Sequence, residues 1–158
     1  MPKISALLHT HNDAPRLGRA LDSLRPCDEV LVIDDSSDDD TTRVAHENGA
    51  SVKSAIPGVA RGTYAMDASH DWIFCLLPNE ALSEELEASL LEWKEQNPEE
   101  TLTCCKVQVR EQKGSGWHTL EPEVRLINRK LLNWLAELPR GHQCDITLKG
   151  DLLRFNNP

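Results

Sequence analysis

The sequence predicts a single α/β domain with a mostly parallel, Rossmann-like sheet, flanking helices and a short mixed C-terminal part. Two observations predict this fold. Up to residue 96, short apolar runs typical of buried strands alternate with segments of helical periodicity. From residue 101 the pattern changes to strand-like segments separated by turns. We therefore expect one domain over 1–158, with a first half at 1–98 and a second half at 99–158.

The first strand–helix–strand unit spans residues 3–33. Strands are expected at 3–8 and 29–33. The helix expected between them has Asp13 as a candidate cap and tolerates Pro15 in its first turn. Its apolar residues recur at helical spacing and should pack on the sheet: Leu17, Ala20, Leu21 and Leu24.

The stretch from residue 31 to residue 43 organises the rest of the chain. Its apolar start ends abruptly at Asp34 and Asp35, as a buried parallel strand ends at its carboxyl edge. A helix is expected at 41–48, and Gly49 can take the left-handed conformation that closes it. Ligands of open α/β sheets bind outside the carboxyl ends of the strands, so the two acids lie where a ligand is expected.

The following units continue the alternation to residue 96. A short strand is expected at 50–54, a weakly periodic helix at 59–68, and the most apolar strand, which should be central, at 72–77. A helix capped by Ser83 then runs to about Gln96.

The second half reads as strands joined by turns. Strands are expected at 101–112 and 124–128, and an edge strand at 146–155. Residues 129–138 fit either a helix or a strand, and their leucine spacing fits a helix.

Composition excludes two classes of partner. The formal net charge is −9 and the isoelectric point is near 5.1, which argues against nonspecific nucleic-acid binding and against adhesion to anionic membranes. The apolar runs are too short to span a bilayer, and Met1 leads into the first strand without a signal peptide. We expect a cytoplasmic protein with no nucleic-acid partner and no integral membrane segment.

The cysteines are expected to be reduced. Their number is odd, no two have a spacing typical of metal ligands, and a cytoplasmic location favours free thiols. They are Cys27, Cys75, Cys104, Cys105 and Cys144.

Two segments carry a resemblance to a known family. Residues 4–13 read ISALLHTHND and residues 32–41 read VIDDSSDDDT. Together they resemble the start of family-2 glycosyltransferases, which typically read SVIIPTYNE and VVDDGSTDGT, and especially the branch that builds lipopolysaccharide cores. The resemblance covers roughly 3–96 and, less well, 117–129. It implies a GT-A fold whose first half binds a nucleotide sugar, with a shortened half on the acceptor side.

The resemblance implies a nucleotide pocket between the first two loops. His11 stands where the family often has a tyrosine ring, and Asp34 matches the acid that accepts a hydrogen bond from the base. Thr10, Asn12 and Asp35 flank these positions and complete the expected nucleotide-binding set. The alternative for each is a polar loop residue without a ligand.

Arg61 is a further nucleotide-binding candidate. Residues 57–65, PGVARGTYA, resemble the family segment GFAAQRNFA, in which a basic residue stands about one position away from Arg61. A guanidinium there can pair with a diphosphate. A surface arginine is the alternative.

The metal-binding motif is the main departure from the family. The central strand of the family ends in LDADE, whose acids hold Mg²⁺ or Mn²⁺ on the diphosphate. Here Leu77 and Asn79 occupy the two Asp positions, and only Glu80 keeps a carboxylate. Hard divalent cations need several oxygens. We expect at most a weak Mg²⁺ or Mn²⁺ site at Asn79 and Glu80, which Asp35 could share, or a chain that works without a metal or has lost turnover.

The base for an inverting transfer has no strong candidate. Such a transfer needs a carboxylate to deprotonate the acceptor hydroxyl. Residues 122–129, PEVRLINR, resemble the family segment PDxQxRLFRR, which makes Glu123 a catalytic candidate beside Glu80. Glu121 and Asp145 are further candidates, and for each a surface acid is the alternative.

Two functions follow from the resemblance. The first is transfer of a sugar from a nucleotide-diphosphate sugar to a hydroxyl of a saccharide or lipid-linked acceptor, in lipopolysaccharide or other cell-surface polysaccharide synthesis. The second is a catalytically inactive GT-A-like domain that binds a nucleotide or a protein. A phosphoacceptor receiver domain, suggested by the acid pair and residues 49–58, conflicts with the apolar strand end at 75–77 and with the strand–helix unit before the acids.

Overall fold

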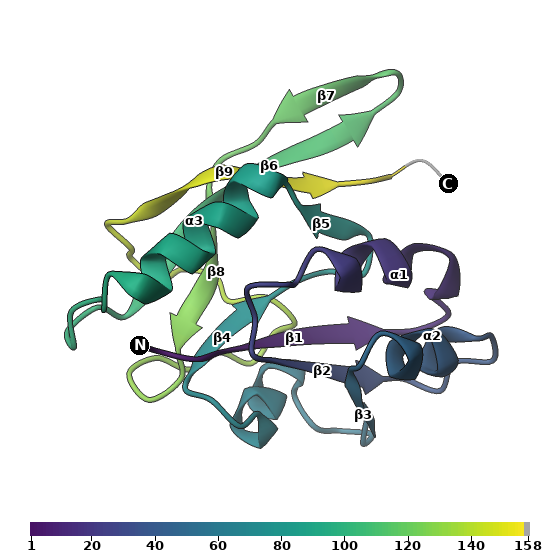
Figure 1. Ribbon diagram of the computed structural model, residues 1–158. Coiled ribbons are helices and arrows are strands. Elements are labelled where there is room, and N and C mark those ends of the chain that lie inside the picture. Colours follow the sequence, from purple (N-terminus) through teal and green to yellow (C-terminus); the bar gives the residue numbers. More distant parts are fainter. Residues whose placement is uncertain (157–158) are drawn as a thin grey trace.

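The computed structural model describes residues 1–156, which form an α/β fold with one mixed β-sheet and covering helices (Figure 1). The strand order is β3-β2-β1-β4-β8-β6-β9-β5, and β7 pairs with β6 beside this path. The predicted fold class is confirmed, with a parallel first part and a mixed second part.

The parallel part contains the first four strands in the order β3-β2-β1-β4. Thr10 pairs with Asp34, which in turn pairs with Ser54, so the carboxyl ends of three strands lie at one edge. The apolar strand β4 is central, as predicted. The strands are β1 (Ile4–Thr10), β2 (Glu29–Asp34), β3 (Ser51–Ser54) and β4 (Trp72–Cys75).

The mixed part continues the same sheet from β4. Strand β8 pairs antiparallel with β4 and with β6, whereas β9 lies parallel to β6 and antiparallel to β5. The predicted edge strand is therefore internal, because the short strand β5 covers its outer side. The strands are β5 (Glu80–Leu82), β6 (Cys104–Lys113), β7 (Gly116–Thr119), β8 (Glu123–Asn128) and β9 (Thr147–Arg154).

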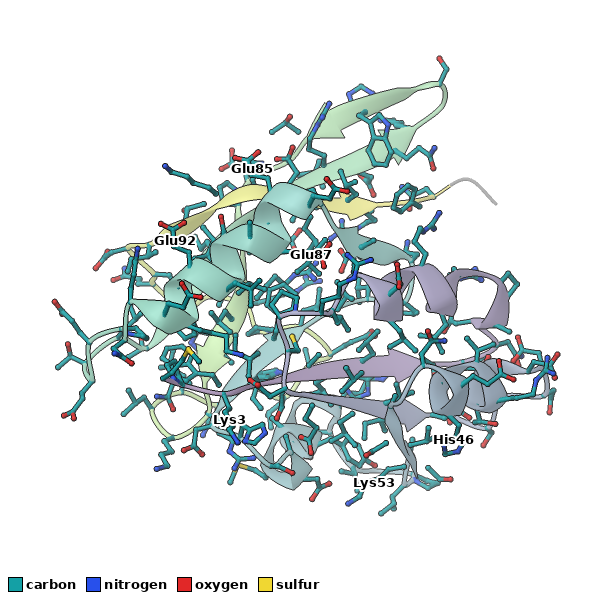
Figure 2. All side chains as sticks on the ribbon, viewed as in Figure 1. Lys3, His46, Lys53, Glu85, Glu87 and Glu92 are labelled. Atoms are coloured by element: carbon teal, nitrogen blue, oxygen red, sulfur yellow. A yellow bond between two sulfur atoms is a disulfide. The ribbon has the colours of Figure 1, made fainter. Side chains whose placement is uncertain are left out.

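Three α-helices contribute to a hydrophobic core on one face of the sheet: α1 (Ala14–Asp22), α2 (Thr41–Glu47) and α3 (Glu84–Glu95). Leu17 and Leu90 are fully buried in this core together with Phe74 of β4. Ser83 caps α3 as predicted, since its hydroxyl accepts from the Leu86 amide, and Gly49 closes α2 with φ of +81°. Figure 2 shows Glu85, Glu87 and Glu92 projecting from α3.

The opposite face is covered by the 3-10 helix η1 (Arg61–Asp67) and by the loop at 129–146, which we name the covering loop. Tyr64 and Trp134 are both buried here against Ile73. A Cβ atom on Gly62 would lie 2.1 Å from the backbone oxygen of Trp134, so only glycine permits this approach. The helix that leucine spacing suggested at 129–138 does not form.

One disulfide contradicts the prediction of reduced cysteines. Cys104 at the start of β6 is bonded to Cys144 of the covering loop, with Cα atoms 5.7 Å apart. The other three cysteines are free. The partners are 40 residues apart in sequence, so only the folded chain brings them together. The bond fastens the covering loop to the sheet.

Candidate functional site

A cleft of about 1110 Å³ opens at the carboxyl edge of the parallel strands. Its floor is made by the loops that follow β1, β2, β3 and β4, and its walls come from α1, η1, the covering loop and the residues after β9. This is the place where an open α/β sheet binds its ligand. The cleft is lined by Thr10, His11, Asp35, Arg61 and Asn79, all predicted site residues.

Asp34 lies beneath the cleft rather than in it. Its side chain is buried, with 6% of the residue exposed. The carboxylate accepts from the Thr10 hydroxyl at 2.7 Å, and from the Ser37 amide and hydroxyl at 3.1 and 2.6 Å. Because these donors are the last residue of β1 and a residue of the loop after β2, Asp34 fixes that loop to the end of β1.

His11 and Asn12 join the loops after β1 and β2. The backbone oxygen of Asp35 lies 2.5 Å from Nδ1 of His11, and since a carbonyl only accepts, Nδ1 carries the proton. Asn12, at φ of +52°, accepts a hydrogen bond from the Asp38 amide at its Oδ1 at 2.7 Å, and its own backbone amide donates to the Ser37 hydroxyl at 2.9 Å. Asn12 therefore shapes the site, while the exposed ring of His11 borders the cleft.

The carboxylate of Asp35 is available to a ligand. Its backbone amide donates to the Thr10 carbonyl at 2.8 Å, which orients the residue. Its side chain is exposed at the cleft, and within residues 1–156 it forms no ion pair. It can accept hydrogen bonds from hydroxyl groups of a sugar or ribose.

Arg61 faces an acid that the sequence analysis did not single out. Its Nη1 lies 3.0 Å from Oε2 of Glu137, which belongs to the covering loop, and both residues line the cleft. Burial raises the pKa of Glu137 although the charge of Arg61 acts in the opposite direction. No local pattern marks Glu137, since its partner is 76 residues away in sequence.

His9 lies at the base of the cleft and is only 7% exposed. Burial, followed by the nearby charge of Arg61, lowers its pKa from 6.5 to about 4. Its ring meets the ring of Tyr64 edge-on, with centroids 6.0 Å apart. The imidazole is therefore neutral at neutral pH.

Glu80 does not fit its predicted catalytic and metal-binding roles. The residue is fully buried. Its Oε1 accepts from Arg125 Nη1 and from the Leu77 amide, at 2.7 and 2.8 Å, while Oε2 accepts from Arg125 Nη2 and Arg154 Nε at 2.7 and 3.0 Å. The carboxylate is thus saturated and shielded. Glu80 has a structural role, joining the turn before β5 to β8 and β9.

The donor set does not fit a divalent cation held by the protein. Asn79 lines the cleft, but its amide donates to the Phe155 carbonyl at 3.3 Å. With Glu80 saturated, Asp35 is the remaining carboxylate of the predicted set. The described part of the chain contains no group of three or more His, Cys, Asp or Glu residues placed to hold a metal ion.

Glu123 also differs from its prediction. It pairs with Arg125 at 3.0 Å and with Arg154 at 3.2 Å. Burial raises its pKa, but the two arginines outweigh burial and the net direction is downward. It lines a separate cavity of about 570 Å³ beside Leu138 and Arg140. A carboxylate with a depressed pKa outside the cleft is poorly suited to be the base.

Comparison with known proteins finds sequences described as glycosyltransferases that are similar to 91 residues of the chain. No family model matches. The chain is 40% identical over 91 residues to an uncharacterized glycosyltransferase of Rickettsia felis, covering 55% of this chain and 32% of the relative. A Rickettsia prowazekii counterpart is 36% identical over 91 residues, covering 55% and 31%. The chain thus spans about a third of the length of the curated relatives that it matches.

Solved structures share the fold at lower identity. TarS of S. aureus in complex with UDP is 19% identical with a TM-score of 0.56, covering 72% of this chain and 37% of that one. Glucosyl-3-phosphoglycerate synthase of Mycobacterium tuberculosis, in complex with Mn²⁺ and UDP-glucose, is 24% identical with a TM-score of 0.54, covering 69% and 44%. The chain is therefore glycosyltransferase-like in sequence over 91 residues and has the GT-A-like fold of these structures.

Proposed function

We propose that the cleft binds a nucleotide-diphosphate sugar, and that the chain serves transfer of the sugar to a hydroxyl of a saccharide or lipid-linked acceptor. The observation that carries the proposal is the position of the cleft, at the carboxyl edge of the parallel strands of a GT-A-like fold. From the sequence resemblance we infer a role in lipopolysaccharide or other cell-surface polysaccharide synthesis.

The groups in the cleft suit a nucleotide-diphosphate sugar. A ligand of this size needs a cavity of several hundred Å³, and the cleft provides about 1110 Å³. The ring of His11 can lie against a base, the carboxylate of Asp35 can accept from ribose hydroxyls, and the guanidinium of Arg61 can bind diphosphate oxygens. The related fold of TarS carries UDP, which supports this ligand class.

Catalysis in this proposal comes from positioning and from charge supplied by arginine. Arg61 would stabilise the leaving diphosphate, since an oriented guanidinium in a partly enclosed site favours developing negative charge. Its pairing with Glu137 keeps the guanidinium oriented before the ligand arrives. Positive charge is assigned to arginine in this proposal because the carboxylate of Glu80 already pairs with Arg125 and Arg154 and is not free to bind a metal ion.

A second candidate function is a nucleotide-binding module without turnover. The observation that favours it is that neither predicted catalytic acid reaches the cleft, because Glu80 is buried and Glu123 lines another cavity. A fold does not guarantee the activity that it usually hosts.

The test is calorimetric titration with a panel of nucleoside diphosphates and nucleotide sugars, with and without Mn²⁺. We expect one nucleotide to bind, and Arg61→Ala to weaken its affinity at least about tenfold, because a charge-assisted bond to phosphate is lost. Arg43→Ala is the matched control, since Arg43 also pairs with an acid at 2.9 Å but lies exposed on α2.

Three outcomes separate the candidates. Binding followed by release of the nucleoside diphosphate in the presence of an acceptor supports the transferase. Binding without release after acceptor screening supports the module. No binding to any member of the panel refutes both.

A further inference from the structure

Two arginines lie one helical turn apart on α1 and line the cleft together. Arg16 and Arg19 are three residues apart, so they share one side of the helix. Partial burial lowers the pKa of Arg19, and the charge of Arg16 lowers it further. The second effect indicates that the two guanidinium groups lie near one another. An arginine stays protonated under all ordinary conditions, so the pair presents positive charge to the cleft.

Arg19 is held in place by an aromatic ring. Its Cζ lies 3.5 Å from the centroid of Phe155, in a cation–π contact. Trp117 of β7 supports the ring edge-on, with centroids 5.2 Å apart and planes at 87°. A ring orients a guanidinium without using its N–H donors, so the hydrogen-bonding capacity of Arg19 is kept for a ligand.

The other arginines that line the cleft are already paired with acids. Arg16 Nε lies 3.0 Å from Asp13, and Arg61 Nη1 lies 3.0 Å from Glu137. Arg19 has no such partner among residues 1–156. In a chain of net charge −9, an oriented cation without an acid partner marks a local site for anions.

The position of Arg19 separates it from the proposed diphosphate contact. Asp35 follows β2 in the parallel part, and Arg61 lies on η1 beyond β3. Phe155, which contacts Arg19, directly follows β9, and Trp117, which supports Phe155, lies on β7, so both rings come from the second half of the chain, on the expected acceptor side. Arg19 on α1 and Arg61 on η1 therefore approach the cleft from opposite faces of the sheet.

We propose that Arg19, supported by Phe155 and assisted by Arg16, forms a subsite for a phosphate group of the acceptor, distinct from the contact with the donor diphosphate. The acceptor would then be a phosphorylated molecule rather than a neutral saccharide. This identification of the anion rests on the proposed function, whereas the anion site itself rests on the geometry of the three side chains.

The experiment is a titration of the whole chain with inorganic phosphate at constant ionic strength, followed through the arginine Nε–Hε signals of ¹⁵N-labelled protein. The Arg19 signal is assigned by its loss in Arg19→Lys. We expect it to shift saturably with phosphate, both without UDP and with UDP at saturation. Followed at the Arg16 signal, Arg19→Ala should weaken phosphate binding at least tenfold, and Phe155→Leu two- to fivefold.

The control is Arg140→Ala, which removes an exposed arginine that lines the separate cavity and likewise has no ion pair among the described residues. Phosphate affinity should stay within twofold of the parent. An Arg19 signal that fails to shift saturably overturns the subsite, and displacement of phosphate by UDP overturns the acceptor assignment. Phosphate binding in a protein that binds no nucleotide leaves the subsite standing while the proposed function fails.

Discussion

His9 shows how a single buried side chain ties stability to pH. The imidazole has a pKa of about 4 in the folded chain, below its ordinary 6.5, because burial and the charge of Arg61 oppose protonation. Its Nε2 is buried without a hydrogen-bond partner in the described residues. The unfolded chain therefore binds a proton at a higher pH than the folded chain does, and acid favours unfolding.

We predict that the contribution of His9 is complete above pH 6.5 and is lost as the pH falls towards 4, by up to about 3 kcal/mol. His9→Asn should flatten the pH dependence of the unfolding free energy over this interval, measured by urea denaturation. His118→Asn, at an exposed position of β7, should leave it unchanged. An identical pH dependence in His9→Asn and the parent would contradict the prediction.

Asp34 supports the rim of the cleft by joining the end of β1 to the loop after β2. We predict that Asp34→Ala abolishes nucleotide binding and lowers stability by about 1–3 kcal/mol, because Thr10 and Ser37 lose their common acceptor. Calorimetry and thermal melting measure the two effects. Asp38→Ala removes an exposed carboxylate from the same loop and should bind normally. A folded Asp34→Ala protein with unchanged affinity would remove Asp34 from the site.

At the scale of elements, the covering loop determines which groups reach the cleft. The Gly62 amide donates to the Leu135 carbonyl at 3.0 Å, and the backbone of Trp134 lies against Gly62. Two residues further on, Glu137 meets Arg61. The contact between η1 and this loop therefore positions the acid beside the guanidinium.

We predict that Gly62→Ala destabilises the protein by about 1–3 kcal/mol and alters nucleotide affinity, since its Cβ would collide with the backbone of the loop. Gly18→Ala is the matched control because a Cβ there meets no atom within 4 Å, and alanine within a helix should raise stability by about 0.5–1 kcal/mol. Thermal melting compares the two variants. Equal melting temperatures for the two variants would contradict the prediction, because the covering loop would then accommodate the added methyl group without loss of stability.

Elements with a strong local pattern could be predicted from the sequence, whereas the covering loop could not. Strands β1, β2 and β4 and helix α3 are marked by local apolar patterns and caps, which the structure follows. The covering loop carries leucines at helical spacing, but it forms no helix. Its apolar side chains pack in one cluster with residues of η1 and with Ile73. Strand β5 has only three residues, too few for any period.

The candidate site was predicted where it follows from strand ends and missed where it depends on distant pairing. Thr10, His11 and Asp35 stand at or directly after the ends of strands, so their place at the cleft could be inferred from the chain. Glu80 was expected at the end of the central strand, but it begins β5, and Arg125, 45 residues later, binds its carboxylate. Phe155 enters the cleft only because β9 is inserted between β6 and β5.

At the scale of the whole molecule, one sheet joins the parallel and mixed parts, and the disulfide adds a covalent link between β6 of the mixed part and the covering loop. Figure 1 shows the parallel strands β1 and β2 on one side of β4 and the longer β6 and β9 on the other. Among residues 1–156 no helix is long and apolar enough to cross a membrane.

We predict that reduction of the Cys104–Cys144 bond lowers the stability of the protein by about 3–4 kcal/mol, since the bond closes a segment of 40 residues and restricts the unfolded chain. The melting temperature should fall by about 10 °C in dithiothreitol. The Cys104→Ser, Cys144→Ser double variant should melt at this lower temperature with or without reductant. If the melting temperature of the double variant also fell in dithiothreitol, the loss of stability would not come from the Cys104–Cys144 bond.

The ion pair between Arg61 and Glu137 has a consequence for the proposed donor. Glu137 would compete with the phosphates of the donor for the guanidinium of Arg61. A diphosphate that draws Arg61 away leaves Glu137 partly buried and without its cation, so the pKa of that carboxyl, already raised by burial, rises further. Ligand binding then takes up a proton, and by linkage the affinity increases as the medium becomes more acidic. The heat of binding would depend on the ionisation enthalpy of the buffer, which gives the exchange of partners at Arg61 a thermodynamic signature.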